Sequence, residues 1–261
     1  MKFLYLLVDI FTIIVPFIFS FHPKLNFYKN YKPFFIGNIL TAIIFISWDV
    51  LFTKMGVWGF NQEYLTGFYF INLPIEEVLF FICIPYACVF TYHCLNLYFK
   101  IKWKPKTEKY FVLSFSLLLL ITGIYFHSKL YTSWTFISLG IILLALKYFA
   151  KINWLAKLVI IYPVLLIPFF IVNGILTGSG LDQPVVWYND LENLGIRFFT
   201  IPVEDVFYGF ELILLNIYFY EYFNNKFDQS KQKIFVDTIK NSKNGRRCIS
   251  TNFNTIKRHG I

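Results

Sequence analysis

Charged side chains are scarce in this 261-residue chain and make up 15% of it. Soluble domains usually carry about 25%, so the deficit argues against a soluble protein and in favour of a membrane protein. Cysteine pairs with metal-ligand spacing are also missing, because the four cysteines form no CxxC motif: Cys83, Cys88, Cys94 and Cys248. Three of the four lie in one apolar run, so we interpret them as small packing residues and expect neither a disulfide nor a metal site.

The positive charge of the chain does not indicate nucleic-acid binding. The formal net charge is +9, but the basic residues fall between apolar segments and in the C-terminal tail. Membrane proteins distribute their basic residues in this way. We therefore expect the lipid bilayer as a partner and no nucleic acid.

Apolar residues are abundant by contrast, at 57% of the sequence with a mean hydropathy of +0.57. A helix needs about 20 apolar residues to cross the hydrocarbon core, and seven stretches are long enough. They cover approximately residues 3–21, 34–53, 72–98, 110–127, 130–150, 155–176 and 200–223. The first lacks a small-residue cleavage site and carries Asp9 and Pro16, so we interpret it as a retained helix. The predicted fold class is an all-α, multi-pass bundle of about seven transmembrane helices.

The lysines predict an orientation in the cell membrane. They concentrate in the loops after the first, third and fifth spans, whereas the opposite side holds Lys2, Lys54, Lys129 and Arg197. Loops rich in Lys and Arg stay in the cytoplasm. We therefore expect the N-terminus outside the cell and a solvated basic tail in the cytoplasm.

Two parts of the chain resemble each other. A shift of 128 residues places "NLPIEEVLFF" (72–81) on "TIPVEDVFYG" (200–209). The aligned pairs include Pro74 with Pro202, Glu76 with Glu204, and Glu77 with Asp205. Upstream, "WDVLFT" resembles "VNGILT" with about four extra residues before the second proline, which pairs Asp49 with Asn173.

The repeat predicts the organisation of the chain. We expect a first three-helix repeat in 1–105, a connector helix in 106–129, a second three-helix repeat in 130–224 and the tail in 225–261. A single connector span makes the two copies parallel. Both acidic motifs then begin helices at the same, extracytoplasmic side.

The duplicated acids are the candidate catalytic residues: Glu76, Glu77, Glu204 and Asp205. An apolar surround and a neighbouring carboxylate both disfavour the ionised form of a carboxyl group. Such a group can keep a proton near neutral pH and donate it, while an ionised partner accepts one. The simpler alternative is that the acids cap free N–H groups in the first helical turn.

Five further residues are candidates for substrate binding or for support of the acids: Asp49, Asn173, Pro74, Pro202 and Glu211. For the aligned Asp49 and Asn173, hydrogen bonds to the acids and ordinary interhelix hydrogen bonds are both open. Proline is favoured in the first helical turn, so both prolines mark helix starts. Glu211 lies two turns below Glu204 and can extend the polar path inward.

The doubled P-x-E-[ED] motif at the start of a membrane helix, with three spans per copy, resembles the integral-membrane lycopene cyclases. In some bacteria these are two small subunits; here both halves lie in one chain, and the resemblance covers roughly residues 1–224. It implies a lycopene beta-cyclase, an isomerase that protonates the end of a linear carotenoid, closes a six-membered ring and returns a proton to a carboxylate, giving γ- and β-carotene. It also implies a carotenoid substrate, other membrane enzymes of carotenoid biosynthesis as partners, and no cofactor. The chain shows no GxGxxG loop after a strand, which separates it from the flavin-dependent lycopene cyclases.

The residues also leave other functions open. A proton-coupled transporter has intramembrane acids and internal repeats too, although the acids here gather near one membrane boundary. A scaffold that binds a partner through its basic tail would explain the acids only as helix caps. If the cyclase hypothesis is right, we expect Glu76→Gln or Glu204→Gln to abolish cyclisation. The ring isomer, the substrate length and the acid and base roles stay open, and one composite site between the copies is favoured over one site per copy.

Overall fold

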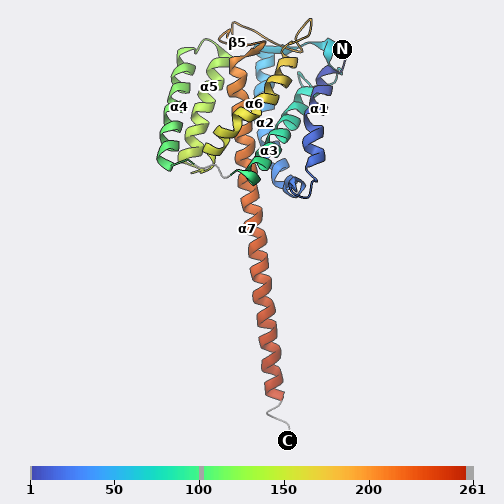
Figure 1. Ribbon diagram of the computed structural model, residues 1–261, viewed down its shortest axis with the longest axis vertical. Coiled ribbons are helices and arrows are strands. Elements are labelled where there is room, and N and C mark those ends of the chain that lie inside the picture. The colour runs from blue at the N-terminus through green and yellow to red at the C-terminus, as the bar shows by residue number, and fades with distance from the viewer. Residues whose placement is uncertain (1, 100–102, 257–261) are drawn as a thin grey trace.

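The computed structural model describes residues 2–99 and 103–256, with side chains described as far as Ser230. In these ranges the chain forms seven α-helices, which confirms the predicted all-α fold (Figure 1). They are α1 (Leu4–Phe19), α2 (Tyr31–Met55), α3 (Ile75–Tyr98), α4 (Pro105–Tyr125), α5 (Leu130–Tyr148), α6 (Leu155–Leu176) and α7 (Val203–Ile256). Two short 3-10 helices, Phe27–Asn30 and Gln62–Tyr64, lie in the connections.

Five of these helices are long and apolar enough to cross a membrane, namely α2 to α6. Helix α1 is apolar but has 16 residues, fewer than the roughly 20 that span a bilayer upright. The outer surface of the bundle is apolar as well, with exposed side chains such as Phe11, Leu118, Ile124 and Ile167. An apolar surface of this extent is expected only where lipid covers it. The chain is therefore a multi-pass membrane protein.

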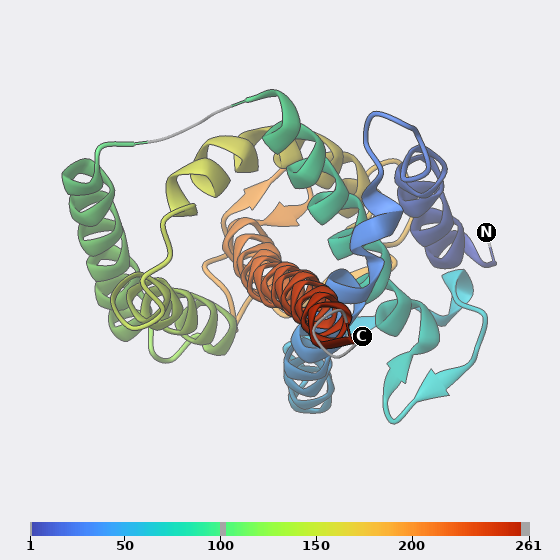
Figure 2. The same cartoon turned by 90° about the horizontal axis from the view of Figure 1, so that it is seen from below.

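Helix α7 lies near the centre of the bundle when it is viewed along its axis, with the α4–α5 pair at one edge and α1 at the other (Figure 2). It then leaves the bundle and continues as a single helix to Ile256 (Figure 1). The sequence predicted a solvated tail from residue 225 and not this helix. No proline occurs in the 54 residues of α7, so nothing in the backbone interrupts the helix where its composition becomes polar.

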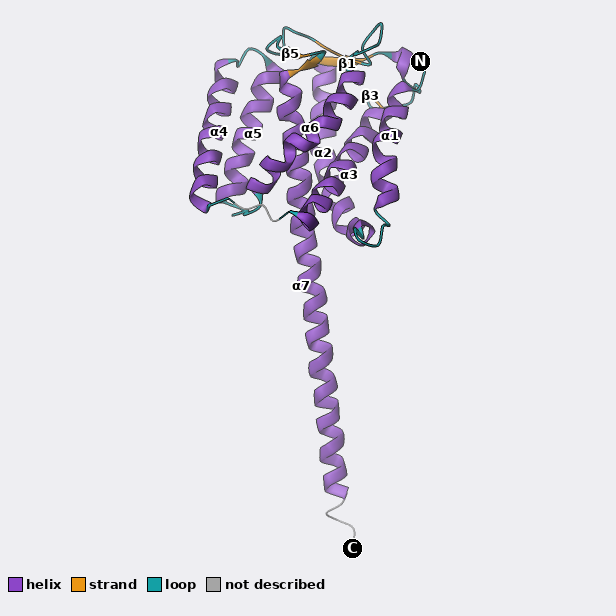
Figure 3. Ribbon diagram, in the orientation of Figure 1, coloured by secondary structure: helices purple, strands orange, loops and turns teal. Residues whose placement is uncertain are grey.

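Within the described residues, six short strands gather at one end of the bundle, the end at which α1 begins (Figure 3). They are β1 (Trp58–Phe60), β2 (Tyr69–Phe70), β3 (Leu73–Pro74), β4 (Val186–Tyr188), β5 (Arg197–Phe198) and β6 (Ile201–Pro202). Two hairpins, β2–β3 and β5–β6, lead directly into α3 and α7. We call the end with the strands the outer end.

The two hairpins have the same geometry. Their turn residues, Ile71 and Phe199, have positive φ angles of 60° and 56°. The first N–H of each following helix, from Ile75 or Val203, donates to a carbonyl seven residues upstream at 2.9 Å. Each of these pairs is separated by 128 residues, so the repeat read from the sequence is also a repeat of local structure.

Strands β1 and β4 join the two repeats by antiparallel pairing, with Gly59 opposite Trp187. A side chain at Gly59 would meet the Trp187 ring at 2.3 Å, so only glycine allows this approach. The residues of this central pair, Gly59 and Trp187, are themselves 128 apart. The strands therefore cross at the pseudo-two-fold axis that relates the repeats.

Candidate active site

Helices α3 and α7 begin at the outer end and bring the two acidic motifs together there. Each begins directly after a proline that ends a hairpin, at Pro74 or Pro202. The prolines mark the helix starts, as predicted. They directly precede the first helical turn and do not lie in it, because both still pair across a strand. The acids follow at the second and third helical positions, where free N–H groups favour negative charge.

The first acid of each motif holds the preceding loop. Oε1 of Glu76 accepts a hydrogen bond from the Thr66 N–H at 2.6 Å, and Oε1 of Glu204 accepts one from the Leu194 N–H at 2.8 Å. The Thr132 hydroxyl also donates to Oε1 of Glu204, at 2.5 Å. Both carboxyl groups are fully buried, and their Oε2 atoms have no partner among the described residues. Glu76 and Glu204 therefore serve the same loop contact in both repeats.

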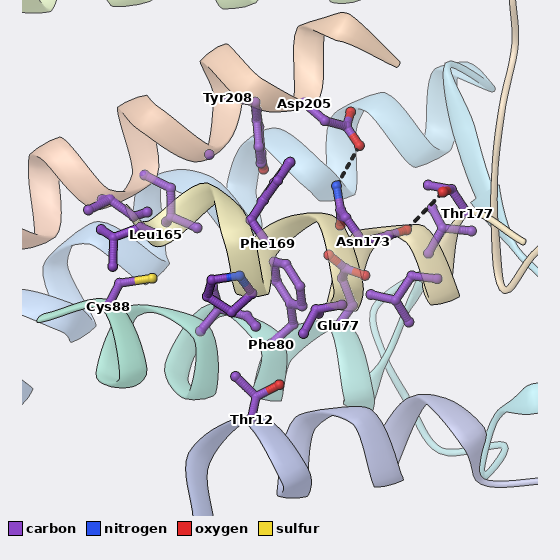
Figure 4. Close-up of a pocket in the computed structure, with 18 of the residues that line it drawn as sticks. Thr12, Glu77, Phe80, Cys88, Leu165, Phe169, Asn173, Thr177, Asp205 and Tyr208 are labelled. Carbon is purple, nitrogen blue, oxygen red and sulfur yellow. Dashed lines mark hydrogen bonds between the residues drawn. The ribbon is translucent and has the colours of Figure 1, made fainter. Parts of the chain in front are cut away.

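The second acid of each motif faces a cavity. Between α3, α6 and α7 lies about 1110 Å³ of empty space, counting its mouth. Glu77 projects from α3 and Asp205 from α7 toward its outer end, with Asn173 of α6 between them (Figure 4). Neighbouring residues differ by about 100° around a helix. This rotation explains why Glu77 lines the cavity while Glu76 does not.

Asp205 is surrounded by hydrogen-bond donors. Its Oδ1 accepts from the Tyr131 hydroxyl at 2.6 Å, and its Oδ2 accepts from the Asn173 amide at 2.8 Å and the Tyr188 hydroxyl at 3.0 Å. A carboxylate is an acceptor only, so three donors match its ionised form. Burial, and secondarily the Asp205 charge, raise the pKa of Tyr188 well above its ordinary value, so this hydroxyl keeps its proton.

The environment of the Glu77 carboxyl group differs from that of Asp205. Its Oε2 accepts one hydrogen bond, from the Tyr5 hydroxyl at 2.5 Å. A second carboxyl, that of Asp49 on α2, lies close enough to interact with it electrostatically and also lines the cavity. Asp49 is hydrogen-bonded by the Trp58 side chain through one oxygen, and its Oδ2 is buried without a partner in the described part of the chain. Two neighbouring buried carboxyls with few donors can share a proton.

Aromatic rings surround the acids at the outer end. Trp58 and Tyr131 lie edge-to-face with their ring centroids 5.1 Å apart, Tyr131 stacks on Tyr188 at 5.9 Å, and Tyr208 lies 6.2 Å from Trp58. All four line the cavity. The negative faces of such rings attract a cation, so the outer end can stabilise a carbocation near the carboxyl groups.

The remaining sequence candidates lie elsewhere. Pro74 and Pro202 do not line the cavity. Glu211 faces α5, where its Oε2 accepts a hydrogen bond from Ser138 at 2.8 Å, and it does not line the cavity either. In each repeat, the structure thus brings together the second acid of the motif and the residue aligned one helix earlier, Asp49 or Asn173.

Several site residues were not singled out from the sequence. Tyr5, Tyr131, Tyr188 and Tyr208 belong to a set of 18 tyrosines, and nothing in their local sequence distinguishes them. Asp9 did carry a signal, since it is an acid within an apolar run. It is buried beside the Tyr5–Glu77 pair, and neither of its carboxyl oxygens has a partner among the described residues.

Comparison with known proteins identifies one family. A family model described as lycopene cyclase matches residues 2–95 and 128–223. The two matched regions contain both acidic motifs and leave out α4. No curated protein and no solved structure matches the chain.

Proposed function

This chain belongs to the lycopene cyclase family, and we propose that it closes the end rings of a linear carotenoid by acid catalysis inside the membrane. The substrate we propose is lycopene and the products are γ- and β-carotene. The observation that carries the proposal is the cavity, which is apolar along α3 and α6 and has its carboxyl groups at the outer end. A long hydrocarbon fits such a lining, and its terminal double bond then lies against the acids.

The proposed reaction moves protons and needs no oxidant or cofactor. Glu77 donates its proton to the terminal double bond, which leaves a tertiary carbocation at the end of the chain. An internal double bond attacks this cation, and a six-membered ring forms with the positive charge now on a ring carbon. Asp205 then removes a neighbouring ring proton, so that a ring double bond forms and the product is an isomer of the substrate.

The hydrogen bonds support this division of roles. Glu77 accepts a hydrogen bond from one donor and lies near the carboxyl group of Asp49. This environment suits a carboxyl group that holds a proton. Asp205 has three donors, which suits a carboxylate that accepts one. Return of the proton from Asp205 to Glu77 resets the site. General acid and base catalysis of this kind contributes typically 10²–10⁴-fold each.

We also propose the orientation and organisation expected from the sequence. Helices α1, α3 and α5 end, and α2, α4 and α6 begin, at the end of the bundle from which α7 projects (Figure 1). The loops after the first, third and fifth spans connect these helix ends in the sequence. Lysines concentrate in these loops, so this end faces the cytoplasm and the strands face outward. Helices α1–α3 and α5–α7 form the two repeats, α4 connects them, and α7 carries the basic tail.

The test is to produce the protein in cells that accumulate lycopene and to separate their pigments by chromatography. We expect conversion to γ- and β-carotene. Unchanged lycopene, in cells whose membranes contain the protein, would refute the proposed substrate. A proton-coupled transporter is the rival hypothesis, and it would require a polar path through the bundle. The inner part of the cavity is lined mainly by apolar side chains, such as Ala87, Leu165 and Ile213.

A further inference from the structure

The pseudo-two-fold axis relates two spaces between helices, one beside α2 and the other beside α6. The repeats differ by 128 residues in α3 and α7, and by 124 in α2 and α6, where Asp49 aligns with Asn173. Phe81 of α3 is therefore equivalent to Gly209 of α7, and Phe45 of α2 to Phe169 of α6. These two pairs decide which space is filled.

The space beside α2 is filled. Phe81 and Phe45 are fully buried with ring centroids 6.1 Å apart, and they pack with Ala42, Leu212 and Leu215. The Asn38 side chain ties α2 to its neighbours by donating to the Phe81 carbonyl at 2.9 Å and to Asn216 at 3.0 Å. Packed side chains of the described residues thus fill this side.

The space beside α6 is open because glycine stands where the other repeat has phenylalanine. A side chain at Gly209 would meet Phe169 at 3.3 Å and the Tyr162 hydroxyl at 3.3 Å. Gly209, Phe169 and Tyr162 all line the cavity, whose inner part lies between α3 and α6. Helix α6 also contains Pro163 and Pro168, which remove backbone hydrogen bonds and allow it to bend away from its neighbours.

Both repeats line the outer end of the cavity. Equivalent residues line it in pairs: Glu77 with Asp205, Phe80 with Tyr208, Ile84 with Leu212, and Phe60 with Tyr188. The inner part is one-sided, since α6 lines it and α2 contributes Asp49 at the outer end. One reaction centre thus leads into one channel.

We infer that the protein cyclises one end of its substrate at a time in this single cavity, and that Gly209 is the residue that opens the channel. The inference rests on the proposed cyclase function. The lining of α3 runs from Glu77 to Thr91, about 21 Å at 1.5 Å per residue. A conjugated polyene is stiff and cannot turn around between packed helices. The monocyclic product must therefore leave the cavity and bind again with its other end toward the acids.

A pulse-chase measurement on membranes containing the protein tests this inference. Labelled lycopene is added first, and a large excess of unlabelled lycopene follows once labelled γ-carotene has formed. We expect the label to remain in γ-carotene, because released product competes with the excess lycopene for the cavity. Passage of the label into β-carotene at the rate seen without the chase would overturn the inference, since both ends would then react without release.

The two proposals can fail separately in this experiment. If no lycopene is consumed by membranes that contain the protein, the proposed function fails. If lycopene is consumed but the label passes directly into β-carotene, only the single-end inference fails.

Substitution of Gly209 tests the channel independently. Gly209→Ala places a methyl group 3.3 Å from Phe169, and we expect a several-fold loss of lycopene conversion; Gly209→Phe, which restores the residue of the other repeat, should lower conversion more than tenfold. Phe81→Leu is the matched control, because it changes the filled space and should leave conversion within about twofold. Full activity of a membrane-inserted Gly209→Phe variant would contradict the assignment of the channel.

Discussion

Replacement of each glutamate of the first motif by glutamine separates the two roles that we propose for them. Glu76 and Glu77 are adjacent, both are buried, and the substitution is the same, so each variant is the matched control of the other. From the sequence alone, we expected substitution of Glu76 or Glu204 to abolish activity. From the geometry, we expect the loss on substitution of the second acid instead, because Glu77 lines the cavity and Glu76 does not.

Glu77→Gln should remove the proposed proton donor and leave the fold intact. The glutamine carbonyl can still accept the hydrogen bond that Glu77 takes from Tyr5 at 2.5 Å. Loss of a general acid lowers the rate by about 10²–10⁴-fold, which corresponds to roughly 2.7–5.4 kcal/mol of activation free energy. We therefore expect lycopene conversion per molecule of protein to fall at least a hundredfold.

Glu76→Gln should act on stability and hardly on the reaction. Its carbonyl can still accept from the Thr66 N–H, which Glu76 binds at 2.6 Å. A neutral acceptor in place of a charged one weakens that bond by about 1 kcal/mol. We expect conversion to stay within a few-fold of that of the original chain, with a slightly lower unfolding temperature in detergent.

The assay measures the rate at which membranes containing each variant consume lycopene. An immunoblot ensures that the membranes contain equal amounts of the variants. The reasoning would be refuted if Glu76→Gln lost activity a hundredfold while Glu77→Gln kept more than a tenth of it.

Two further predictions concern the base and the C-terminal helix. Asp205→Asn should lower lycopene conversion by roughly a hundredfold or more, because the amide cannot take up the ring proton; full activity with a normal product distribution would exclude Asp205 as the base. A chain that ends at Ser230 keeps every residue that lines the cavity, so it should convert lycopene within about twofold of the full chain. Loss of activity in a truncated protein that still inserts into the membrane would show that the residues after Ser230 are needed for the reaction.

The presence of buried carboxyl groups in the cavity could be predicted in part from the sequence. Acids within apolar runs indicated buried carboxyl groups, and the doubled motif indicated that two such groups come from equivalent helix starts. The prolines indicated where these helices begin, whereas the hairpins before them were not predicted. The partners of these acids were not predictable, because Tyr5, Tyr131 and Tyr188 come from three distant parts of the chain and share no local pattern.

What the sequence determined by itself is what depends on local composition: the apolar helices, their approximate ends, the parallel repeat and the membrane setting. Helix length in a bilayer and a proline at a helix start are local properties, so short windows of sequence suffice for them. Tertiary structure alone decided which carboxyl group of each motif faces the cavity, since that depends on how α3 and α7 are rotated against their neighbours. It also decided that one of two equivalent spaces is open: Phe81 and Gly209 stand at the same place in the aligned motifs, but their effect on shape appears only when α2 and α6 are in position.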